Sequence, residues 1–280
     1  MNFYFIGDKS ERSRVHAKLL QNACVTHDVK FNYIDAEKVS YFDLPELDQS
    51  DSVYRHSVLL RAKLIEQTIL NDKCKHFYLD WRTGLGRRAS SFFLNEKYGV
   101  PVIPTIPFLP TTPEEVLRTV DFFDTFPVII KVMGYSNGGG VIKIDSIESF
   151  KSIIDYLRIT GVNAVVRKFV PHRYYGRLVV LDGKIIGSHK TIVPAQEFRS
   201  NTIENVDSNR ISQVFSEEVE SAAVLAVSSL GLKFGGVDVL FDENQKFYIS
   251  EVNFPCAFRY THEVAGVDVA SLMIEYLKNS

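Results

Sequence analysis

A glycine-rich loop lies between two short apolar stretches at residues 127–144, and this arrangement narrows the choice of folds more than any other part of the sequence. The first stretch ends near Lys131, and the loop contains Gly138, Gly139 and Gly140. Glycines let backbone N–H groups approach phosphate oxygens, and a lysine ammonium adds a compact positive charge. The loop returns into a strand, whereas Rossmann and Walker A loops open a helix. The pattern favours a phosphate-binding hairpin of another class; a flexible hairpin with a solvated lysine is the alternative.

Acidic and amide side chains are placed in a second hairpin pattern at residues 235–253. Asp238 lies in its first apolar stretch, and Glu251 and Asn253 lie two residues apart in its second. Side chains two apart in a strand share a face, so Glu251 and Asn253 are predicted to lie together, with Asp238 able to meet them from the neighbouring strand. This oxygen-rich set suits Mg²⁺, with Mn²⁺ as a second option. The alternative is a pair of acids facing outward on an exposed sheet.

The two segments together match the needs of an enzyme that uses ATP. One segment would grip the phosphates, and the other would supply the metal ion. Phosphoryl transfer depends mainly on such positioning and electrostatic stabilisation.

Charge and cysteine content exclude several classes of function. The 280-residue chain has a formal net charge of −2, so no basic field indicates nucleic acid or an anionic membrane as a partner. Its three cysteines lack CxxC spacing, which argues against a disulfide framework or a zinc site and fits a reducing cytoplasm. The first residues are predicted to form a strand rather than a signal peptide, and no apolar run approaches the ~20 residues that cross a membrane.

The hydrophobic patterning predicts a small parallel α/β layer in residues 1–82. Its strands are expected at residues 2–6, 30–34 and 76–79, and its helices at 14–21 and 58–70. Tyr54 and Arg55 are expected at the exposed start of a helix, with the lining of an acceptor pocket as the alternative. A proline-rich connector follows at residues 101–113.

The remaining residues are predicted to alternate between strands and helices. Thr112 and Ser146 are expected to cap helices. Asp182-Gly183 is expected to form a hairpin turn. Strands are expected at 128–132, 141–144 and 164–170, hairpins at 177–189 and 235–252, and helices at 91–98, 215–230 and 267–277.

In these segments the chain resembles the ATP-grasp superfamily, and within it the RimK-like carboxylate–amine ligases. The resemblance is carried by VIIKVMGYSNGGGV, VVRKFV, EFRSN, GGVDVLF, SEVN and AGVDVASLMIEYL, in that order. It implies an α/β fold (α+β lobes): a small N-terminal pre-grasp α/β domain at 1–82, a central ATP-grasp lobe with the glycine-rich phosphate lid at 83–163, and a C-terminal ATP-grasp lobe with the metal site at 164–280.

The resemblance also implies roles for individual residues. The metal ligands would be Asp238, Glu251 and Asn253. Catalysis would involve Lys131, Arg199 and Asn201. The residues implied to bind ATP are Arg88, Lys131, Ser136, Asn137, Gly138, Gly139, Gly140, Arg167, Lys168, Phe169 and Val170.

The sequence departs from the family pattern at several of these positions. Arg88 stands where a lysine is usual, and Arg167-Lys168 replaces Gln-Glu, so an acidic side-chain contact to the adenine is lost and main-chain contacts from Lys168 and Val170 remain. Candidate substrate residues are Arg177, Lys190 and Arg259. Arg177 matches a family arginine that is usually preceded two residues earlier by an acid. For Arg259 the alternative is a structural salt bridge.

The implied reaction is ATP-dependent ligation of a carboxylate to an amine, with an acyl phosphate as the intermediate and an amide or peptide bond as the product. The substrates would be amino acids, peptides or a protein tail, and the protein is expected to be cytoplasmic and to form a homo-oligomer. Two alternatives stay open: a nucleotide-binding regulatory or scaffold protein without ligase activity, and a small-molecule kinase on the same fold. His172 and His189 are interpreted as hydrogen-bonded or surface histidines, with acid/base chemistry or substrate binding as the alternative.

Overall fold

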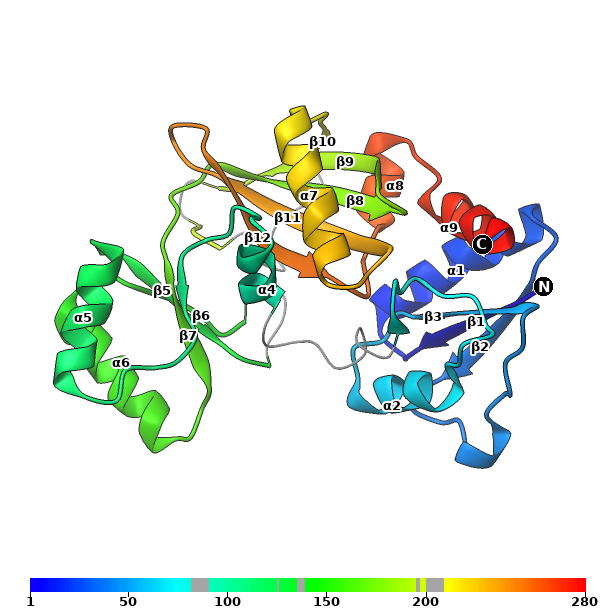
Figure 1. Cartoon of the computed structure of the whole chain (residues 1–280), viewed down its shortest axis with the longest axis horizontal. Coiled ribbons are helices and arrows are strands. Elements are labelled where there is room, and N and C mark those ends of the chain that lie inside the picture. Colours follow the sequence, from blue (N-terminus) through cyan, green and yellow to red (C-terminus); the bar gives the residue numbers. More distant parts are fainter. Residues whose placement is uncertain (82–90, 125, 135–138, 195–196, 200–208) are drawn as a thin grey trace.

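The computed structural model of the chain describes residues 1–81, 91–124, 126–134, 139–194, 197–199 and 209–280. The described residues form three β-sheets that follow one another along the long axis of the molecule (Figure 1). A three-stranded N-terminal sheet lies at one end, a four-stranded sheet lies at the other, and a five-stranded sheet lies between them. Both chain termini lie beside the N-terminal sheet.

The N-terminal sheet is parallel, in the order β2-β1-β3, with β1 (Asn2–Gly7) in the middle. Strand β2 (Lys30–Asp35) forms one edge and β3 (Asp51–Arg55) the other. Helix α1 (Glu11–Thr26) begins where the Ser10 side chain accepts a hydrogen bond from the Ser13 N–H. It packs against Phe3 and Phe5, while α2 (Leu60–Ile69) packs on the other face against Ile6 and Ile34. A short 3₁₀ turn, η1 (Tyr41–Asp43), lies between β2 and β3.

The third strand of this sheet was predicted at the wrong place. It is β3, whereas residues 75–79 make only isolated bridges to two different segments, Lys75 with Ser52 and Tyr78 with Leu232. Tyr54 and Arg55 were expected at an exposed helix start, but they lie in β3 with 1% and 4% of their surfaces exposed. Charged residues at the ends of β3 made the hydrophobic pattern indicate an exposed segment. In the structure β3 is buried, because an ion pair with Glu66 offsets the charge of Arg55.

The four-stranded sheet has the order β4-β7-β5-β6. Alternate residues of its strands pack on α5 (Pro113–Phe123) and α6 (Ile147–Ile159), which Thr112 and Ser146 cap as predicted. The other alternate residues face away from these helices. Its strands are β4 (Thr105–Ile106), β5 (Val128–Val132), β6 (Val141–Ile144) and β7 (Ala164–Lys168).

Strand β7 pairs with β5 along its whole length, so this sheet extends past the predicted domain boundary between residues 163 and 164. The boundary had placed residues 164–168 with the C-terminal lobe. Backbone pairing with β5 on one side and β4 on the other holds β7 in the four-stranded sheet instead.

The five-stranded sheet is antiparallel, in the order β10-β9-β8-β11-β12. The predicted turn between β8 and β9 is present, with φ of 47° at Asp182 and 75° at Gly183. Helix α7 (Glu217–Ser229) covers one face of the sheet, and α4 (Ser91–Lys97) packs beside α7 and β12. The strands are β8 (Tyr174–Leu181), β9 (Lys184–Ile192), β10 (Arg210–Ser212), β11 (Phe234–Phe241) and β12 (Phe247–Asn253).

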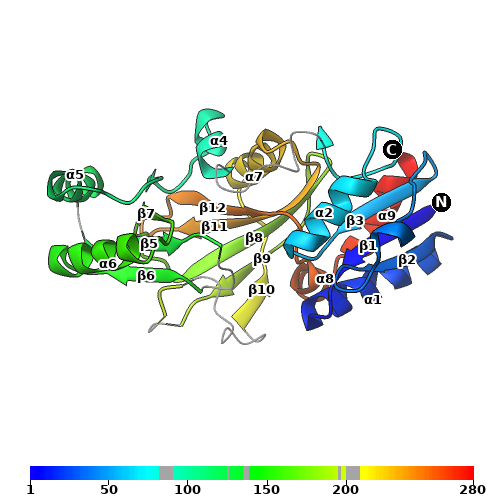
Figure 2. The ribbon, with the colours of Figure 1, turned by 90° about the horizontal axis from the view of Figure 1, so that it is seen from below.

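The C-terminal helices return to the N-terminal sheet. Helix α8 (Arg259–Ala265) leads into α9 (Val269–Asn279), which lies beside α1 (Figures 1 and 2). Met273 and Leu277 of α9 share a core with Phe3 and Phe5. The two ends of the chain therefore build one hydrophobic core. None of the helices in the described ranges has the length and apolar character needed to cross a bilayer.

Candidate active site

The four-stranded sheet carries positive charge on the face opposite its helices. In β5, Val128, Ile130 and Val132 are buried, so Lys131 projects from the other face. Arg167 and Lys143 both stand opposite Ile129 in the neighbouring strands, which places them on the same face as Lys131. Lys143 was not among the site residues predicted from the sequence. Its position within the apolar strand VIKI is the signal that could have indicated it.

The β11–β12 hairpin brings together the three predicted metal ligands. Asp238 stands directly opposite Glu251, and Gly236 stands opposite Asn253. Side chains two residues apart share a face, so all three point to the same side of the hairpin. The Asn253 amide donates a hydrogen bond from Nδ2 to Asp238 Oδ2 at 3.0 Å, which leaves its amide oxygen as an acceptor.

The cationic face and the acidic hairpin meet. Lys131 Nζ lies 3.4 Å from Glu251 Oε2, and the two side chains are 32% and 40% exposed. An ion pair this exposed to water contributes at most about 1 kcal/mol to stability. Its importance is that it shows the two side chains to be neighbours. Arg167 extends the contact by donating from Nη2 to the Ser250 carbonyl at 3.3 Å. Two motifs that are 120 residues apart in the sequence thus form one site.

Arg177, a predicted substrate residue, is bound to Asp238. Its Nε and Nη2 donate to the two Asp238 oxygens at 2.6 and 3.0 Å, and the Asp238 side chain is only 2% exposed. Burial lowers the pKa of the Arg177 guanidinium, but Asp238 outweighs it and raises the pKa above its ordinary value. This geometry suits an arginine that orients a metal ligand.

Arg167 is also buried, with 6% of its surface exposed, and Nε donates to Thr105 Oγ1 at 3.2 Å. Burial lowers the pKa of Arg167 to about 10, against the opposite effect of Glu251, so the side chain stays charged at neutral pH. The Lys168 N–H donates to the Pro104 carbonyl at 3.0 Å, so this N–H is engaged and cannot be the one that meets an adenine. Lys143 Nζ lies 5.2 Å from the Phe169 ring centroid.

The other predicted cations lie around β9 and α8. Arg199 forms two hydrogen bonds of 2.9 Å with the Glu197 carboxylate, and these lower the pKa of Glu197 to about 2. Lys190 Nζ lies 5.8 Å from the Tyr174 ring centroid. Arg259 pairs with Glu263 at 2.8 Å, which is the salt-bridge alternative considered for it.

Of the remaining predicted residues, some lie within the described ranges and five lie outside them. In the segment predicted to form the lid, the Gly140 carbonyl accepts from the Val132 N–H at 2.8 Å, and the Gly140 φ of 72° suits glycine. Val170 is buried, and its carbonyl contacts His172 Nδ1 at 2.8 Å. His189 is buried beside Thr261, as interpreted, and burial lowers its pKa to about 3. Five predicted site residues lie outside the described residues: Arg88, Ser136, Asn137, Gly138 and Asn201.

Comparison with known proteins decides the family of this chain. The model of the RimK-like ATP-grasp domain matches residues 89–277, which is more than half of the chain. The chain belongs to the RimK-like ATP-grasp family. This confirms the resemblance that the sequence motifs indicated.

Individual relatives of this RimK-like chain agree with that placement. A protein named probable alpha-L-glutamate ligase from Methanococcoides burtonii is 25% identical over 268 residues, which cover 91% of this chain and 82% of the relative. Among solved structures, the ATP-grasp ligase PsnB, complexed with minimal precursor, Mg and ADP, has a TM-score of 0.72 at 15% identity, covering 99% of this chain and 96% of PsnB.

A second solved structure is the macrocyclase MdnC bound with precursor peptide MdnA from Microcystis aeruginosa MRC. Its TM-score is 0.73 at 11% identity, and the match covers all of both chains. At such identities the likeness shows a common ATP-grasp fold. Together with the family and its ligase relatives, it identifies this chain as an ATP-dependent ligase that joins a carboxylate to an amine.

The site fits the ATP and Mg²⁺ that this family uses. Asp238, Glu251 and Asn253 offer the hard oxygen ligands that Mg²⁺ prefers. Lys131 and Arg167 offer positive charge to phosphate oxygens, one as a compact ammonium and one as a planar guanidinium. Because the Lys131 ammonium already contacts Glu251, the groups predicted to bind the metal ion and the phosphates lie close together.

Proposed function

We propose that this RimK-like ligase activates the carboxylate of an amino acid, a peptide or a protein tail as an acyl phosphate and transfers it to an amine. The observation that carries the proposal is the 3.4 Å contact between Lys131 and Glu251. It joins the strand predicted to bind phosphate with the hairpin predicted to bind metal.

The described residues support a division of roles. Lys131, Lys143 and Arg167 would hold the phosphates, and Asp238, Glu251 and Asn253 would hold Mg²⁺, or Mn²⁺ in its place. When bound, the metal ion neutralises phosphate charge as it develops during transfer. Arg177 would keep the Asp238 carboxylate in position through its two hydrogen bonds. Arg199 would balance the charge of the acyl phosphate, and Lys190 of β9 would assist it.

Several assignments rest on the sequence motifs. Arg88 and Asn201 would contact phosphate and substrate, Ser136, Asn137 and Gly138–140 would form the phosphate lid, and Arg259 would approach a substrate carboxylate. In the adenine-lining segment, Lys168, Phe169 and Val170 keep their proposed place, with the Lys168 N–H donating to the Pro104 carbonyl and not to the adenine.

The relatives support the substrate class. One relative is named a probable alpha-L-glutamate ligase, and glutamate is an α-amino acid. Two structural neighbours were solved with their precursors, PsnB with a minimal precursor and MdnC with precursor peptide MdnA. We therefore propose an α-amino acid or peptide as one substrate. A cytoplasmic location and a homo-oligomeric state stay predictions, which cell fractionation and gel filtration test.

The decisive experiment measures ADP release from purified protein with ATP, Mg²⁺ and pooled amino acids or peptides. A ligase requires both a carboxylate and an amine. ADP release without an amine would support a kinase, and ATP binding without turnover would support a scaffold.

The matched variants are Lys131→Ala, Glu251→Gln and the control Lys151→Ala, which removes an exposed lysine of α6. We expect the first two to lose about 10²–10³-fold in kcat, because each removes a charge that would lie at the transferred phosphoryl group. The control should keep wild-type turnover. Near-normal turnover of either site variant would contradict the assignment.

A further inference from the structure

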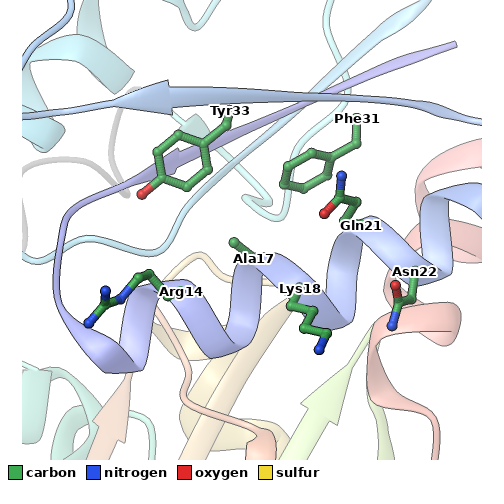
Figure 3. A pocket seen from close by; sticks show the side chains of 7 residues that line it. All are labelled: Arg14, Ala17, Lys18, Gln21, Asn22, Phe31 and Tyr33. Atoms are coloured by element: carbon green, nitrogen blue, oxygen red, sulfur yellow. The ribbon is translucent and has the colours of Figure 1, made fainter.

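A groove on the N-terminal sheet lies outside the site described above. It has a volume of about 610 Å³ and runs between α1 and the edge strand β2. Figure 3 shows Phe31 and Tyr33 pointing from β2 toward α1, with Arg14, Lys18 and Gln21 along the helix. Figure 2 places α1 and β2 at the end of the molecule opposite β5, β6 and β7, so the groove is remote from the reacting groups.

The aromatic wall of the groove is fixed in place. Phe31 contacts the rings of Phe3 and Phe5, each with a centroid separation of 6.1 Å. The ring centroids of Tyr33 and Phe5 lie 5.6 Å apart, and the Tyr33 hydroxyl donates to the Asp8 carbonyl at 2.9 Å. Tyr33 nevertheless exposes 42% of its surface. A rigid, half-open aromatic surface loses little conformational freedom when a ligand covers it.

Strand β2 also has an open backbone edge, because it ends the sheet and pairs only with β1 among the described residues. The N–H groups of Lys30 and Ala36 donate to Met1 and Gly7, on the β1 side. Backbone groups alternate in direction along a strand, so those of Phe31 and Tyr33 point to the open side. Such an edge can accept one more strand from another chain.

The charges lining the groove have one sign. Arg14 and Lys18 are its only charged lining residues, and neither forms an ion pair within the part of the chain that the structure describes. Two carboxylates near the end of β2, Asp35 and Glu37, are paired with Lys38 and Lys9. The groove therefore presents two positive charges that have no ion-pair partner among the described residues.

The spacing of these charges matches an extended peptide. Arg14 and Lys18 are one helical turn apart, about 6 Å along the axis. Alternate residues of a strand are about 6.6 Å apart and share a face. Carboxylates at positions i and i+2 of an added strand can therefore meet both cations, while their stems cover Phe31 and Tyr33.

We infer that the groove between α1 and β2 is a docking site for an acidic peptide segment that adds to the free edge of β2. This inference rests on the proposed ligation of a peptide or protein, and it assigns recognition of a remote acidic stretch to the N-terminal sheet. Docking far from the reacting bond lowers KM and leaves kcat unchanged.

The test uses full-length protein and a fluorescein-labelled decapeptide of alternating glutamate and valine, measured by fluorescence anisotropy without ATP. The double variant Arg14→Glu/Lys18→Glu should bind about tenfold more weakly or worse, because two attractive charge pairs become repulsive. The control Lys73→Glu/Lys151→Glu makes the same charge change at exposed lysines outside the groove and should keep at least half of the affinity. Equal loss in both double variants would overturn the proposal.

Hydrogen exchange distinguishes strand addition from simple charge attraction. The peptide should slow exchange at the amides of Phe31 and Tyr33, which face the open edge, and leave those of Asn32 and Ile34 unchanged. Binding without protection at the open edge would overturn the strand model. If gel filtration shows a dimer that Arg14→Glu/Lys18→Glu dissociates, the edge is occupied by a second copy, which also overturns it.

Ligase assays separate this inference from the proposed function. With a peptide substrate that carries a remote acidic segment, the groove variant should raise KM about tenfold at unchanged kcat, and a substrate without the segment should be insensitive. Ligation that is indifferent to the groove variant would overturn the docking site alone. Peptide binding at the groove without any ligation would overturn the proposed function alone.

Discussion

The Arg177–Asp238 pair illustrates how a single residue at this site has its role defined by its neighbours. Both side chains are largely buried, and Asp238 accepts from Arg177 and Asn253. The sequence suggested that Arg177 binds substrate, but an isolated motif cannot show that its guanidinium is already bound to a carboxylate. Burial and pairing become visible only when β8 lies beside β11.

Replacing Arg177 with alanine should therefore destabilise the protein by about 3–5 kcal/mol, because it leaves the Asp238 carboxylate buried without its charge partner. Chemical denaturation measures this change. The matched control is Arg118→Ala, which breaks an exposed pair with Glu114 and should cost less than about 1 kcal/mol. Equal costs for the two variants would show that Asp238 does not depend on Arg177.

His16 predicts how stability depends on pH. Its Nδ1 donates to the Arg12 carbonyl, and its Nε2 accepts from the N–H groups of Phe258 and Arg259 at 3.0 and 3.2 Å. Burial lowers its pKa from 6.5 to about 4. Between these values the unfolded chain binds more protons than the folded protein, so the stabilisation is complete above pH 6.5 and is lost as pH falls toward 4.

The free energy of unfolding should accordingly fall by up to about 1.4 kcal/mol per pH unit for this histidine. His56, stacked on His16 and also buried, has a pKa lowered in the same direction and adds to the slope. Urea denaturation between pH 7.5 and 5 measures the effect, and His16→Gln should flatten it. A variant with the wild-type slope would exclude His16 as a source.

At the scale of elements, β11 depends on two adjacent glycines that differ in surroundings. A Cβ atom on Gly236 would lie 2.7 Å from both Arg177 Nη1 and Cys256 Sγ, whereas one on Gly235 would meet Val227 Cγ2 at 3.2 Å. The close approach at Gly236 is what lets Arg177 reach Asp238.

Gly236→Ala should cost about 1–3 kcal/mol and lower turnover, because the added methyl group displaces Arg177 from Asp238 in the β11–β12 hairpin. Gly235→Ala is its matched control, since it adds the same methyl group one residue away, and should keep most of the activity. Thermal melting and ADP release measure the two effects. The reverse order of activities would contradict the role given to Gly236.

The elements also show where sequence patterns succeed. The β5–β6 and β11–β12 hairpins, the Asp182-Gly183 turn and the capped starts of α5 and α6 were predicted because each is encoded within a few neighbouring residues. Strand β3 was missed because its pairing with β1 joins residues about 50 positions apart and buries charged side chains. Local periodicity contains no information on such pairing.

At the scale of the whole molecule, the two ends of the chain support each other. Helix α9 packs Met273, Ile274 and Leu277 into the core formed by Phe3 and Phe5. Tyr54 adds a buried link, because its hydroxyl donates to the Cys256 carbonyl and accepts from the Cys256 N–H, both at 3.1 Å. The predicted division into residues 1–82, 83–163 and 164–280 thus does not match the hydrophobic cores, because one core contains residues of both the first and the last segment.

Deletion of residues 268–280 should destabilise the N-terminal sheet as well as the C-terminus, because it exposes the apolar side of α1. Circular dichroism should show a broadened or absent thermal transition. Deletion of residues 279–280 alone, which are exposed, should leave the transition unchanged. A sharp, wild-type transition in the longer deletion would contradict a joint core.

The sequence by itself indicated the family that the comparison confirmed, and it predicted the phosphate and metal motifs and most local elements, because these depend on residue type and short spacing. The tertiary structure decided which charges meet: Lys131 with Glu251, Arg177 with Asp238, and α9 with α1. The tertiary structure also formed the groove between α1 and β2. These relations depend on how strands pair and lobes pack over more than a hundred residues, and no local pattern specifies that arrangement.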